Sequence, residues 1–193
     1  MKKCNLYVDV TAKTCILTLF NSDNQLIDES ITQTNNNLIE LVNPKLEELM
    51  QRNNISFADL AKIYVIYGPG SFTGVRVGVN LAKTIKSVYS DVEILVMNTL
   101  KAMCLGNGLA TLDAKGKKWY IAGYQDNKEV LPLTMVFEEE KNQLIQAHKD
   151  LRYYSDEEIT DIKRAEFAYK MLDQFEPVEN WIELEPLYIK EAL

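Results

Sequence analysis

The glycine-rich segment at residues 68–78 constrains the fold of this chain more than any other feature. It reads Gly68-Pro69-Gly70-Ser71-Phe72-Thr73-Gly74-Val75-Arg76-Val77-Gly78 and holds four of the eight glycines. It joins a strand-like run at 62–67 to a helical pattern that continues to about Ser90. A strand, a Gly/Pro turn and a helix in succession form a βα unit whose first helical N–H groups lack intrahelical partners. The segment therefore predicts either an anion site or a tightly packed corner.

The spacing of the glycines favours packing over phosphate binding. Free N–H groups at a helix start attract phosphate, but neither the G-x-x-x-x-G-K-[ST] nor the G-x-G-x-x-G spacing is present. Gly70, Gly74, Gly78 and Ala82 instead recur every four residues, so the last three form one ridge of small residues on the helix. Because a glycine inside a helix costs about 1 kcal/mol relative to alanine, the ridge indicates that another helix or a backbone comes very close.

The other residues of this helix divide into an apolar and a polar side. The stripe predicted to face the strands contains Val77, Leu81, Ile85 and Val88. The opposite, solvated side contains Arg76, Asn80, Lys83 and Ser87. Val75, Val79 and the small ridge widen the apolar arc to about half the circumference, more than the stripe of about 100° that one sheet requires. The excess predicts a second buried contact, with either a partner subunit or another helix of the same domain.

Composition and residue counts exclude several classes of function. A net charge of −7 argues against non-specific nucleic-acid binding by this chain alone. Cys4, Cys15 and Cys104 are widely spaced and predict buried, reduced thiols in a cytoplasmic protein, and no apolar run is long enough for a membrane span. His148 is the single histidine, so a histidine-based zinc hydrolase cannot be assembled. We expect His148 to be an ordinary surface or strand residue.

Several stretches resemble the bacterial TsaB (YeaZ) family in the same order along the chain. The run Gly68–Lys86 resembles the family signature, and Tyr7–Thr11 resembles its opening strand and Asp-Thr turn. Val96–Ala102, Asp113-Ala114 with Tyr120, and Pro186–Lys190 resemble further family motifs. The resemblance implies an actin-like, sugar-kinase-like ATPase (ASKHA) fold of the α/β class, with two lobes of which the second is reduced.

The order of predicted elements agrees with that fold. Strands are predicted at 5–10, 15–20, 25–31, 62–67 and 93–97, with helices at 36–52, from the glycine segment to about 90, and at 99–105. The segment Gly106-Asn107-Gly108 predicts a joint between a lobe at 1–105 and a smaller lobe at 106–193. In the second lobe we expect a hairpin at 109–125, strands at 130–137 and 143–148 around a solvated turn at 138–141, and a helix at 160–175.

The resemblance also implies an accessory role in tRNA modification. TsaB proteins pair with the similarly folded catalytic subunit TsaD through helices of their N-terminal lobes. With TsaE, a small ATPase, they transfer a threonylcarbamoyl group onto N6 of adenosine 37 in tRNA. ATP and metal are then expected on the partner subunits, and tRNA would be contacted only through the complex. The implied partner interface consists of Gly70, Ser71, Phe72, Thr73, Gly74, Gly78 and Ala82.

The first phosphate loop of actin-like ATPases is degraded in this chain. Asp9 retains the acid that organises Mg²⁺, but Thr11 stands where the family of ATPases has glycine. We therefore expect no catalytic residue and no cofactor bound by the chain alone. The alternatives are a stand-alone small-molecule kinase or ATPase, and a homodimeric scaffold; a homodimer would also be compatible with the accessory role. Arg76 is expected either in an ion pair within the complex or on the solvated face, and Asp113 either across the interlobe cleft or capping a turn.

Overall fold

The structure is a computed structural model that describes residues 3–35 and 37–189. By its internal contacts the chain divides into two compact units. The first comprises the chain up to Met97 together with Phe175–Pro186, and the second comprises Asn98–Gln174 together with the chain from Leu187 onward. The predicted boundary after residue 105 therefore differs from the observed one, because 98–105 packs with the second unit. The predicted second lobe also included 175–186, which returns to the first unit.

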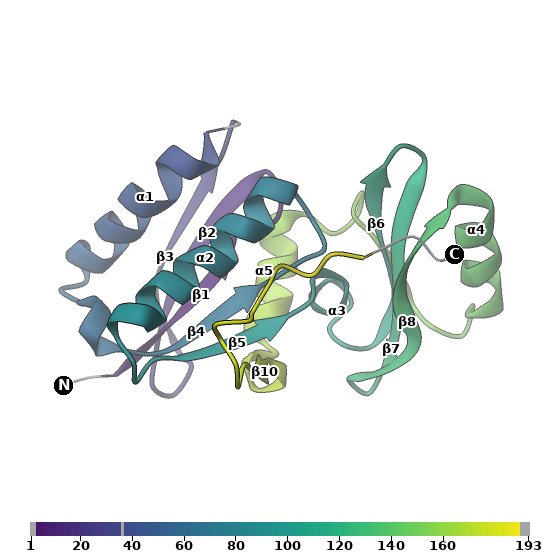
Figure 1. The fold of residues 1–193 in the computed structure, drawn as a ribbon. Coiled ribbons are helices and arrows are strands. Elements are labelled where there is room, and N and C mark those ends of the chain that lie inside the picture. The colour runs from purple at the N-terminus through teal and green to yellow at the C-terminus, as the bar shows by residue number, and fades with distance from the viewer. Residues whose placement is uncertain (1–2, 36, 190–193) are drawn as a thin grey trace. The chain divides into compact units, whose positions relative to one another are not determined.

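The first unit is built on a six-stranded sheet in the order β10-β5-β4-β1-β2-β3, with helices α1 and α2 on one face (Figure 1). Its elements are β1 (Cys4–Asp9), β2 (Thr14–Asn21), β3 (Leu26–Gln33), α1 (Leu38–Arg52), the 3-10 turn η1 (Phe57–Asp59), β4 (Leu60–Ile66), α2 (Phe72–Val88), β5 (Glu93–Met97) and β10 (Glu176–Pro177). Strands β1, β4 and β5 are parallel, whereas β2 is antiparallel to both β1 and β3. This arrangement confirms the predicted actin-like core.

The first helix shows how the apolar pattern builds the core. Leu38, Val42, Leu46 and Leu49 recur at helical spacing and are buried against the same face of the sheet. The predicted helix began at Asn36, which lies outside the described residues. Pro44 lies within α1 without ending it. Among the helices that the structure describes, none is long and apolar enough to cross a membrane.

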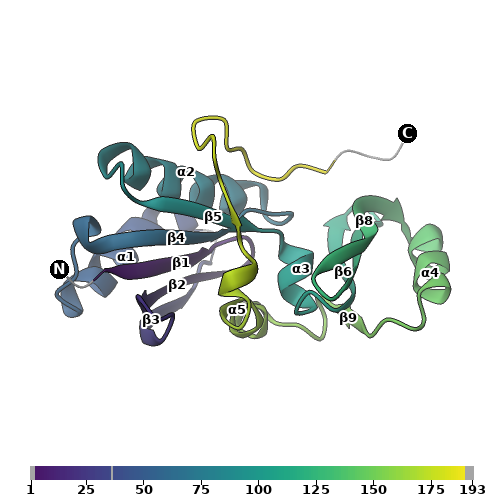
Figure 2. The ribbon, with the colours of Figure 1, turned by 90° about the horizontal axis from the view of Figure 1, so that it is seen from below.

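The second unit is a four-stranded sheet in the order β8-β7-β6-β9, with helices on both faces (Figure 2). Its elements are α3 (Thr99–Met103), β6 (Gly108–Lys115), β7 (Lys118–Gln125), β8 (Lys128–Phe137), α4 (Glu138–Ala147), β9 (Tyr153–Ser155), α5 (Asp161–Tyr169) and the 3-10 turn η2 (Leu172–Gln174). The strand predicted at 143–148 is wrong, because these residues belong mainly to α4. The expected turn at 138–141 is the first turn of α4, where acidic residues Glu138–Glu140 favour the positive end of the helix.

The chain returns to the first unit immediately after η2. Phe175 packs edge-on against Tyr64 and Tyr7, with ring centroids 5.2 and 6.3 Å apart. β10 then adds to β5 in antiparallel orientation, with Pro177 opposite Leu95. Farther along, Trp181 packs against the core of the first unit. This C-terminal segment therefore completes the fold of the N-terminal part of the chain.

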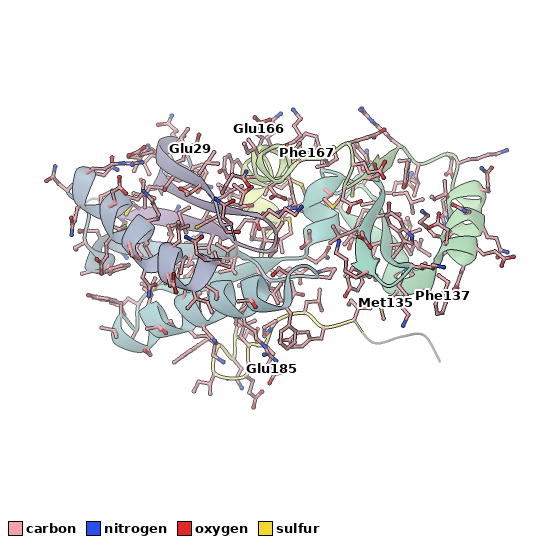
Figure 3. The ribbon with its side chains drawn as sticks, turned by 90° about the horizontal axis from the view of Figure 1, so that it is seen from above. Glu29, Met135, Phe137, Glu166, Phe167 and Glu185 are labelled. Atoms are coloured by element: carbon pink, nitrogen blue, oxygen red, sulfur yellow. The ribbon has the colours of Figure 1, made fainter. Side chains whose placement is uncertain are left out.

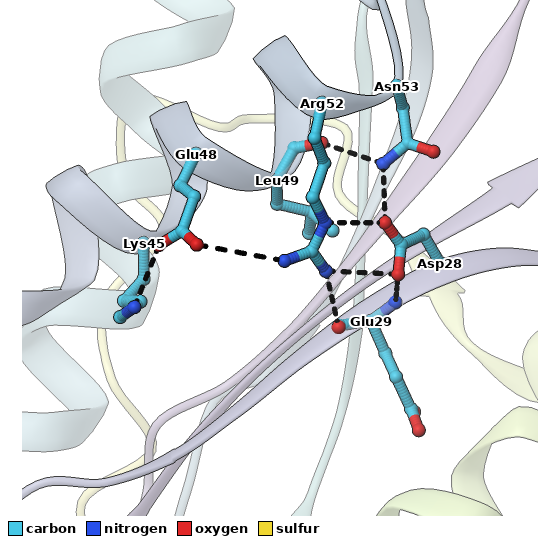
Figure 4. Close-up of polar contacts among 7 residues, drawn as sticks. All are labelled: Asp28, Glu29, Lys45, Glu48, Leu49, Arg52 and Asn53. Carbon is cyan, nitrogen blue, oxygen red and sulfur yellow. Dashed lines mark hydrogen bonds and ion pairs between the residues drawn. The ribbon is translucent and has the colours of Figure 1, made fainter.

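A polar cluster connects the end of α1 to the edge strand β3 (Figure 4). Arg52 donates from Nε to Oδ2 of Asp28 at 2.6 Å and from Nη2 to Oδ1 at 3.0 Å. Asn53 donates to the same carboxylate at 2.6 Å, and its side chain also donates to the Leu49 carbonyl at 2.8 Å. The cluster fixes the C-terminal turn of α1 over β3.

This cluster predicts an acid-dependent contribution to stability. Hydrogen bonds from Arg52, and then from Asn53, lower the pKa of Asp28 from 3.8 to about 2. Because the folded pKa lies below the unfolded value, the carboxylate stabilises the fold above about pH 4, and this contribution is lost as the pH falls toward about 2. We expect Asp28→Asn to lower the free energy of unfolding by about 1 kcal/mol at neutral pH. Urea unfolding at neutral and acidic pH should show the difference from the parent chain shrinking below about pH 4.

The matched control is Asp23→Asn, which makes the same chemical change in the exposed turn before β3. It should leave the pH dependence of the parent chain intact. A constant difference between Asp28→Asn and the parent chain across this range would contradict the prediction.

Candidate functional site

At the end of β1, the Asp9 carboxylate is hydrogen-bonded to Thr11 in the loop that follows. Asp9 is fully buried, and its Oδ1 accepts hydrogen bonds from the Thr11 backbone N–H at 3.1 Å and the Thr11 hydroxyl at 2.7 Å. The Thr11 carbonyl in turn accepts a hydrogen bond from the Ser71 N–H at 2.6 Å. The predicted phosphate loop is therefore locked against the start of α2.

The glycines of α2 permit a backbone-to-backbone contact with this loop. A Cβ atom on Gly70 would lie 2.5 Å from the Thr11 carbonyl oxygen, and one on Gly74 would overlap the Val10 carbonyl oxygen. At Gly78 the nearest atom would be Cγ2 of Val10 at 3.2 Å. The packing interpretation of the glycine spacing is thus confirmed, and the close neighbour is the chain's own β1 and the loop that follows it.

The predicted interface residues separate into a buried and an exposed group. Gly74, Gly78 and Ala82 are buried against the chain's own sheet. The idea that these three positions directly receive a partner's helix therefore does not hold. The remaining interface residues, Gly70–Thr73, are exposed at the start of α2, and their contact with a partner stays a prediction.

The apolar stripe predicted for α2 does not coincide with the face of the helix that is buried. The buried face consists of Val75, Val79 and Ile85 together with the small ridge. Val77 and Leu81 are only half-buried, and Val88 is 69% exposed. The stripe was misplaced because the helix approaches the sheet with its smallest residues rather than its bulkiest.

The second contact expected for α2 comes from the C-terminal segment of the same unit. Val77 and Leu81 pack on the core together with Trp181. Nζ of Lys83 donates to the carbonyl oxygens of Ile182 at 2.7 Å and Leu184 at 2.9 Å. This segment therefore contacts α2 through Lys83, and a contact of α2 with a partner subunit stays a prediction. No periodic pattern in the sequence predicts the contact through Lys83.

An aromatic–cation stack occupies the exposed first turn of α2. Ser71 caps the helix by accepting a hydrogen bond from the Gly74 N–H at 3.3 Å. Phe72 is 60% exposed, and Cζ of Arg76 lies 3.6 Å from the centroid of its ring. Arg76 is exposed in this chain, as expected for the solvated face, and its alternative role in an ion pair within a complex stays a prediction. The stack itself was not predicted.

The other residues considered as site candidates lie in a turn, at a helix end or in the core. Asp113 caps the β6–β7 turn, because its carboxylate accepts from the Lys115 N–H and pairs with Nζ of Lys115, both at 2.7 Å. His148 caps the end of α4, with Nδ1 2.9 Å from the Leu144 carbonyl oxygen. Burial raises the pKa of Cys4 to about 11 and those of Cys15 and Cys104 to about 12, so these thiols stay protonated at neutral pH. Within the described part of the chain, no three His, Cys, Asp or Glu side chains gather as metal ligands.

Comparison with known proteins identifies the family. Residues 28–166 match a protein family described as TsaD, tRNA N6-adenosine threonylcarbamoyltransferase. Over 126 residues the chain is 32% identical to the tRNA threonylcarbamoyladenosine biosynthesis protein TsaB of Bacillus subtilis, covering 62% of this chain and 54% of that protein. The chain belongs to this family, within its TsaB/YeaZ group. The TsaB/YeaZ group is involved in threonylcarbamoyladenosine biosynthesis. The chain spans about half the length of the B. subtilis protein.

Two further relatives match along nearly their whole length. An uncharacterized protein of Mycoplasma pneumoniae, the MG208 homolog, is 30% identical over 194 residues, which cover 99% of this chain and 97% of that one. A crystal structure from Pseudomonas aeruginosa, titled as similar to peptidase YeaZ, superposes with a TM-score of 0.71 at 15% identity. The superposition covers 97% of this chain and 100% of the other, and it supports the TsaB/YeaZ fold assignment.

Proposed function

We propose that this chain is the accessory subunit of tRNA N6-threonylcarbamoyladenosine synthesis that binds and activates the catalytic subunit TsaD. TsaE is the third component of the proposed complex, and tRNA is contacted only through that complex. Membership of the TsaB/YeaZ group supports this role. In the absence of TsaD, the same surface can pair with a second copy of the chain.

The residues at the expected nucleotide site do not fit a phosphate–Mg²⁺ group. A phosphate loop needs backbone N–H groups that point outward and a carboxylate that can reach the metal's water. Here the Thr11 N–H points to Asp9, and the buried Asp9 carboxylate is occupied by Thr11. This geometry disfavours the stand-alone kinase, and we place ATP and metal on the partner subunits.

The exposed turn Gly70–Thr73 carries the proposed contact with TsaD. Phe72 presents a large apolar ring to solvent, and Arg76 stacks on it. Aromatic and arginine side chains are enriched among the residues that dominate binding energy at protein interfaces. The backbone beneath them is rigid, because Ser71 is tied to Thr11 and the glycines pack on the Val10–Thr11 loop. A preorganised anchor loses little entropy on binding.

We expect Phe72→Ala to weaken binding to TsaD from the same organism by at least about tenfold, as for a moderate interface hot spot. Phe72 is exposed, so its truncation should leave the folded unit stable. Size-exclusion chromatography with light scattering would detect the complex, with and without Mg-ATP. Titration calorimetry would then give the affinities of the parent chain and the variant.

Val88→Ala is the matched control, because Val88 is also an exposed apolar residue and lies at the opposite end of α2. It should bind TsaD as the parent chain does. If the parent chain forms no complex under either condition, the accessory role itself fails. If the parent chain and Phe72→Ala bind equally well, the role stands and the assigned surface is wrong.

A further inference from the structure

The outer edge of β3 has the properties of a surface that attracts another strand. β3 is a terminal strand of the six-stranded sheet, and three of its apolar side chains are exposed: Leu26 by 55%, Ile27 by 42% and Ile31 by 38%. Ile31 lies on the same side of the strand as Glu29, since side chains alternate there, whereas the pairing of β3 with β2 is irregular at Ile27. An exposed edge strand with apolar side chains is a template for strand addition from another chain.

Both backbone hydrogen-bonding groups of Glu29 are engaged by side chains of the Asp28–Arg52 pair. The Glu29 N–H donates to Oδ1 of Asp28 at 2.8 Å, and the Glu29 carbonyl accepts from Nη2 of Arg52 at 2.7 Å (Figure 4). In an antiparallel ladder the N–H and C=O of one residue either both face the neighbouring strand or both point away from it. The groups of Glu29 therefore point to the outside of the sheet, and so, by the same alternation, do those of Ile31.

The Asp28–Arg52 pair is held in place from the helix side. Nε and Nη2 of Arg52 contact both carboxylate oxygens of Asp28, and Asn53 donates to Oδ2 at 2.6 Å. Nη1 of Arg52 also lies 3.9 Å from Oε1 of Glu48. A bidentate, multiply held guanidinium is more rigid than an isolated surface ion pair. An incoming strand would have to displace these contacts before it could pair with Glu29.

We propose that Asp28 and Arg52 form a guard that prevents a second copy of this chain from adding its β3 to the β3 edge. Within one chain, Asp28 and Arg52 already hydrogen-bond to the outward N–H and C=O of Glu29. A new strand would need these two groups to form its own backbone hydrogen bonds. The second copy is the favoured occupant because its β3 carries the same three exposed apolar side chains, which edge-to-edge pairing would partly remove from water. Figure 3 shows Glu29 on β3, at the margin of the first unit.

The test removes the guard without changing the strand. Arg52→Met keeps much of the apolar stem but removes the donors to Asp28 and Glu29. Lys45→Met is the matched control, because it removes the same charge from α1, where Lys45 pairs only with Glu48 among the ion pairs of the described residues. We expect Arg52→Met to form a larger species at a concentration about tenfold lower than the parent chain, because an incoming strand no longer has to displace the hydrogen bond from Arg52 to the Glu29 carbonyl. Light scattering during size-exclusion chromatography over a concentration series would measure this.

Two further results decide between edge opening and general destabilisation. Adding Ile31→Lys to Arg52→Met should restore the oligomeric state of the parent chain, since a lysine on an edge strand opposes pairing. In the unmodified chain, hydrogen exchange of the Glu29 amide should be about tenfold slower than that of the Ile31 amide, because the Glu29 N–H is held by Asp28 whereas no side chain among the described residues accepts from the Ile31 N–H. Equal exchange at these two amides overturns the proposal even if Arg52→Met fails to fold. The proposal is also overturned if the Arg52→Met variant folds but associates no more strongly than the parent chain and the Lys45→Met variant.

Discussion

Gly74→Ala is expected to lower the free energy of unfolding of the first unit by about 3 kcal/mol or more. The cost is this large because the added methyl group meets backbone atoms that cannot move aside. The added Cβ would overlap the Val10 carbonyl oxygen and lie 3.0 Å from the Val10 carbonyl carbon. Neither side can move easily, because Val10 follows the central strand β1 and α2 is tied to the loop through Ser71 and Thr11. Native domains are stable by only about 5–15 kcal/mol, so this single methyl group should have a large effect.

Urea unfolding followed by tryptophan fluorescence would measure the effect on the first unit alone. Trp181 lies in the first unit and Trp119 in the second, so a Trp119→Phe background leaves one reporter. Gly78→Ala on the same helix is the control. There the nearest atom is a side-chain methyl at 3.2 Å, and alanine gains about 1 kcal/mol of helix propensity. Gly78→Ala should therefore stay within about 1 kcal/mol of the parent chain. Equal unfolding midpoints for Gly74→Ala and Gly78→Ala would contradict the close approach at Val10.

The parts of the fold that depend on local pattern could be predicted from the sequence. The order of strands and helices through Met97 follows from apolar runs punctuated by Gly, Pro and Asn, and the glycine spacing indicated a close contact. The neighbour of the glycines could not be found this way. The contact is with the Val10 carbonyl, distant in sequence, and hydrophobic periodicity locates bulky side chains rather than the small ones that allow two backbones to approach.

Two further errors have distinct physical causes. The strand predicted at 143–148 ignored the three glutamates that precede it, whose charges favour a helix N-terminus at Glu138. The return of Phe175–Pro186 to the first unit depends on a two-residue strand and on irregular backbone held by Lys83. Such contacts have no period, so only the folded chain shows them. The Phe72–Arg76 stack has a local signal in the sequence, since residues four apart share a helix face.

Phe175→Ala is expected to destabilise the first unit by about 3–5 kcal/mol, the usual cost of truncating a buried phenylalanine. Phe175 is 4% exposed and packs edge-on against Tyr7 and Tyr64, which lie on the central strands β1 and β4. The residue also immediately precedes β10, so a cavity here should loosen the pairing of β10 with β5. In the Trp119→Phe background, the fluorescence of Trp181 should report both losses, because Trp181 belongs to the segment that Phe175 anchors.

Phe137→Ala is the control for this change, since it removes the same ring where β8 meets α4 in the second unit (Figure 3). Phe137 is 58% exposed, so its truncation should cost less than about 1 kcal/mol. If Phe175→Ala unfolds at the same urea concentration as Phe137→Ala, the C-terminal segment is not part of the first unit's core. If it unfolds much earlier, residues encoded after Asn98–Gln174 of the second unit are required for the stability of the first. The N-terminal part of the chain alone would then be an incomplete fold, and TsaD-binding experiments would have to use the full chain.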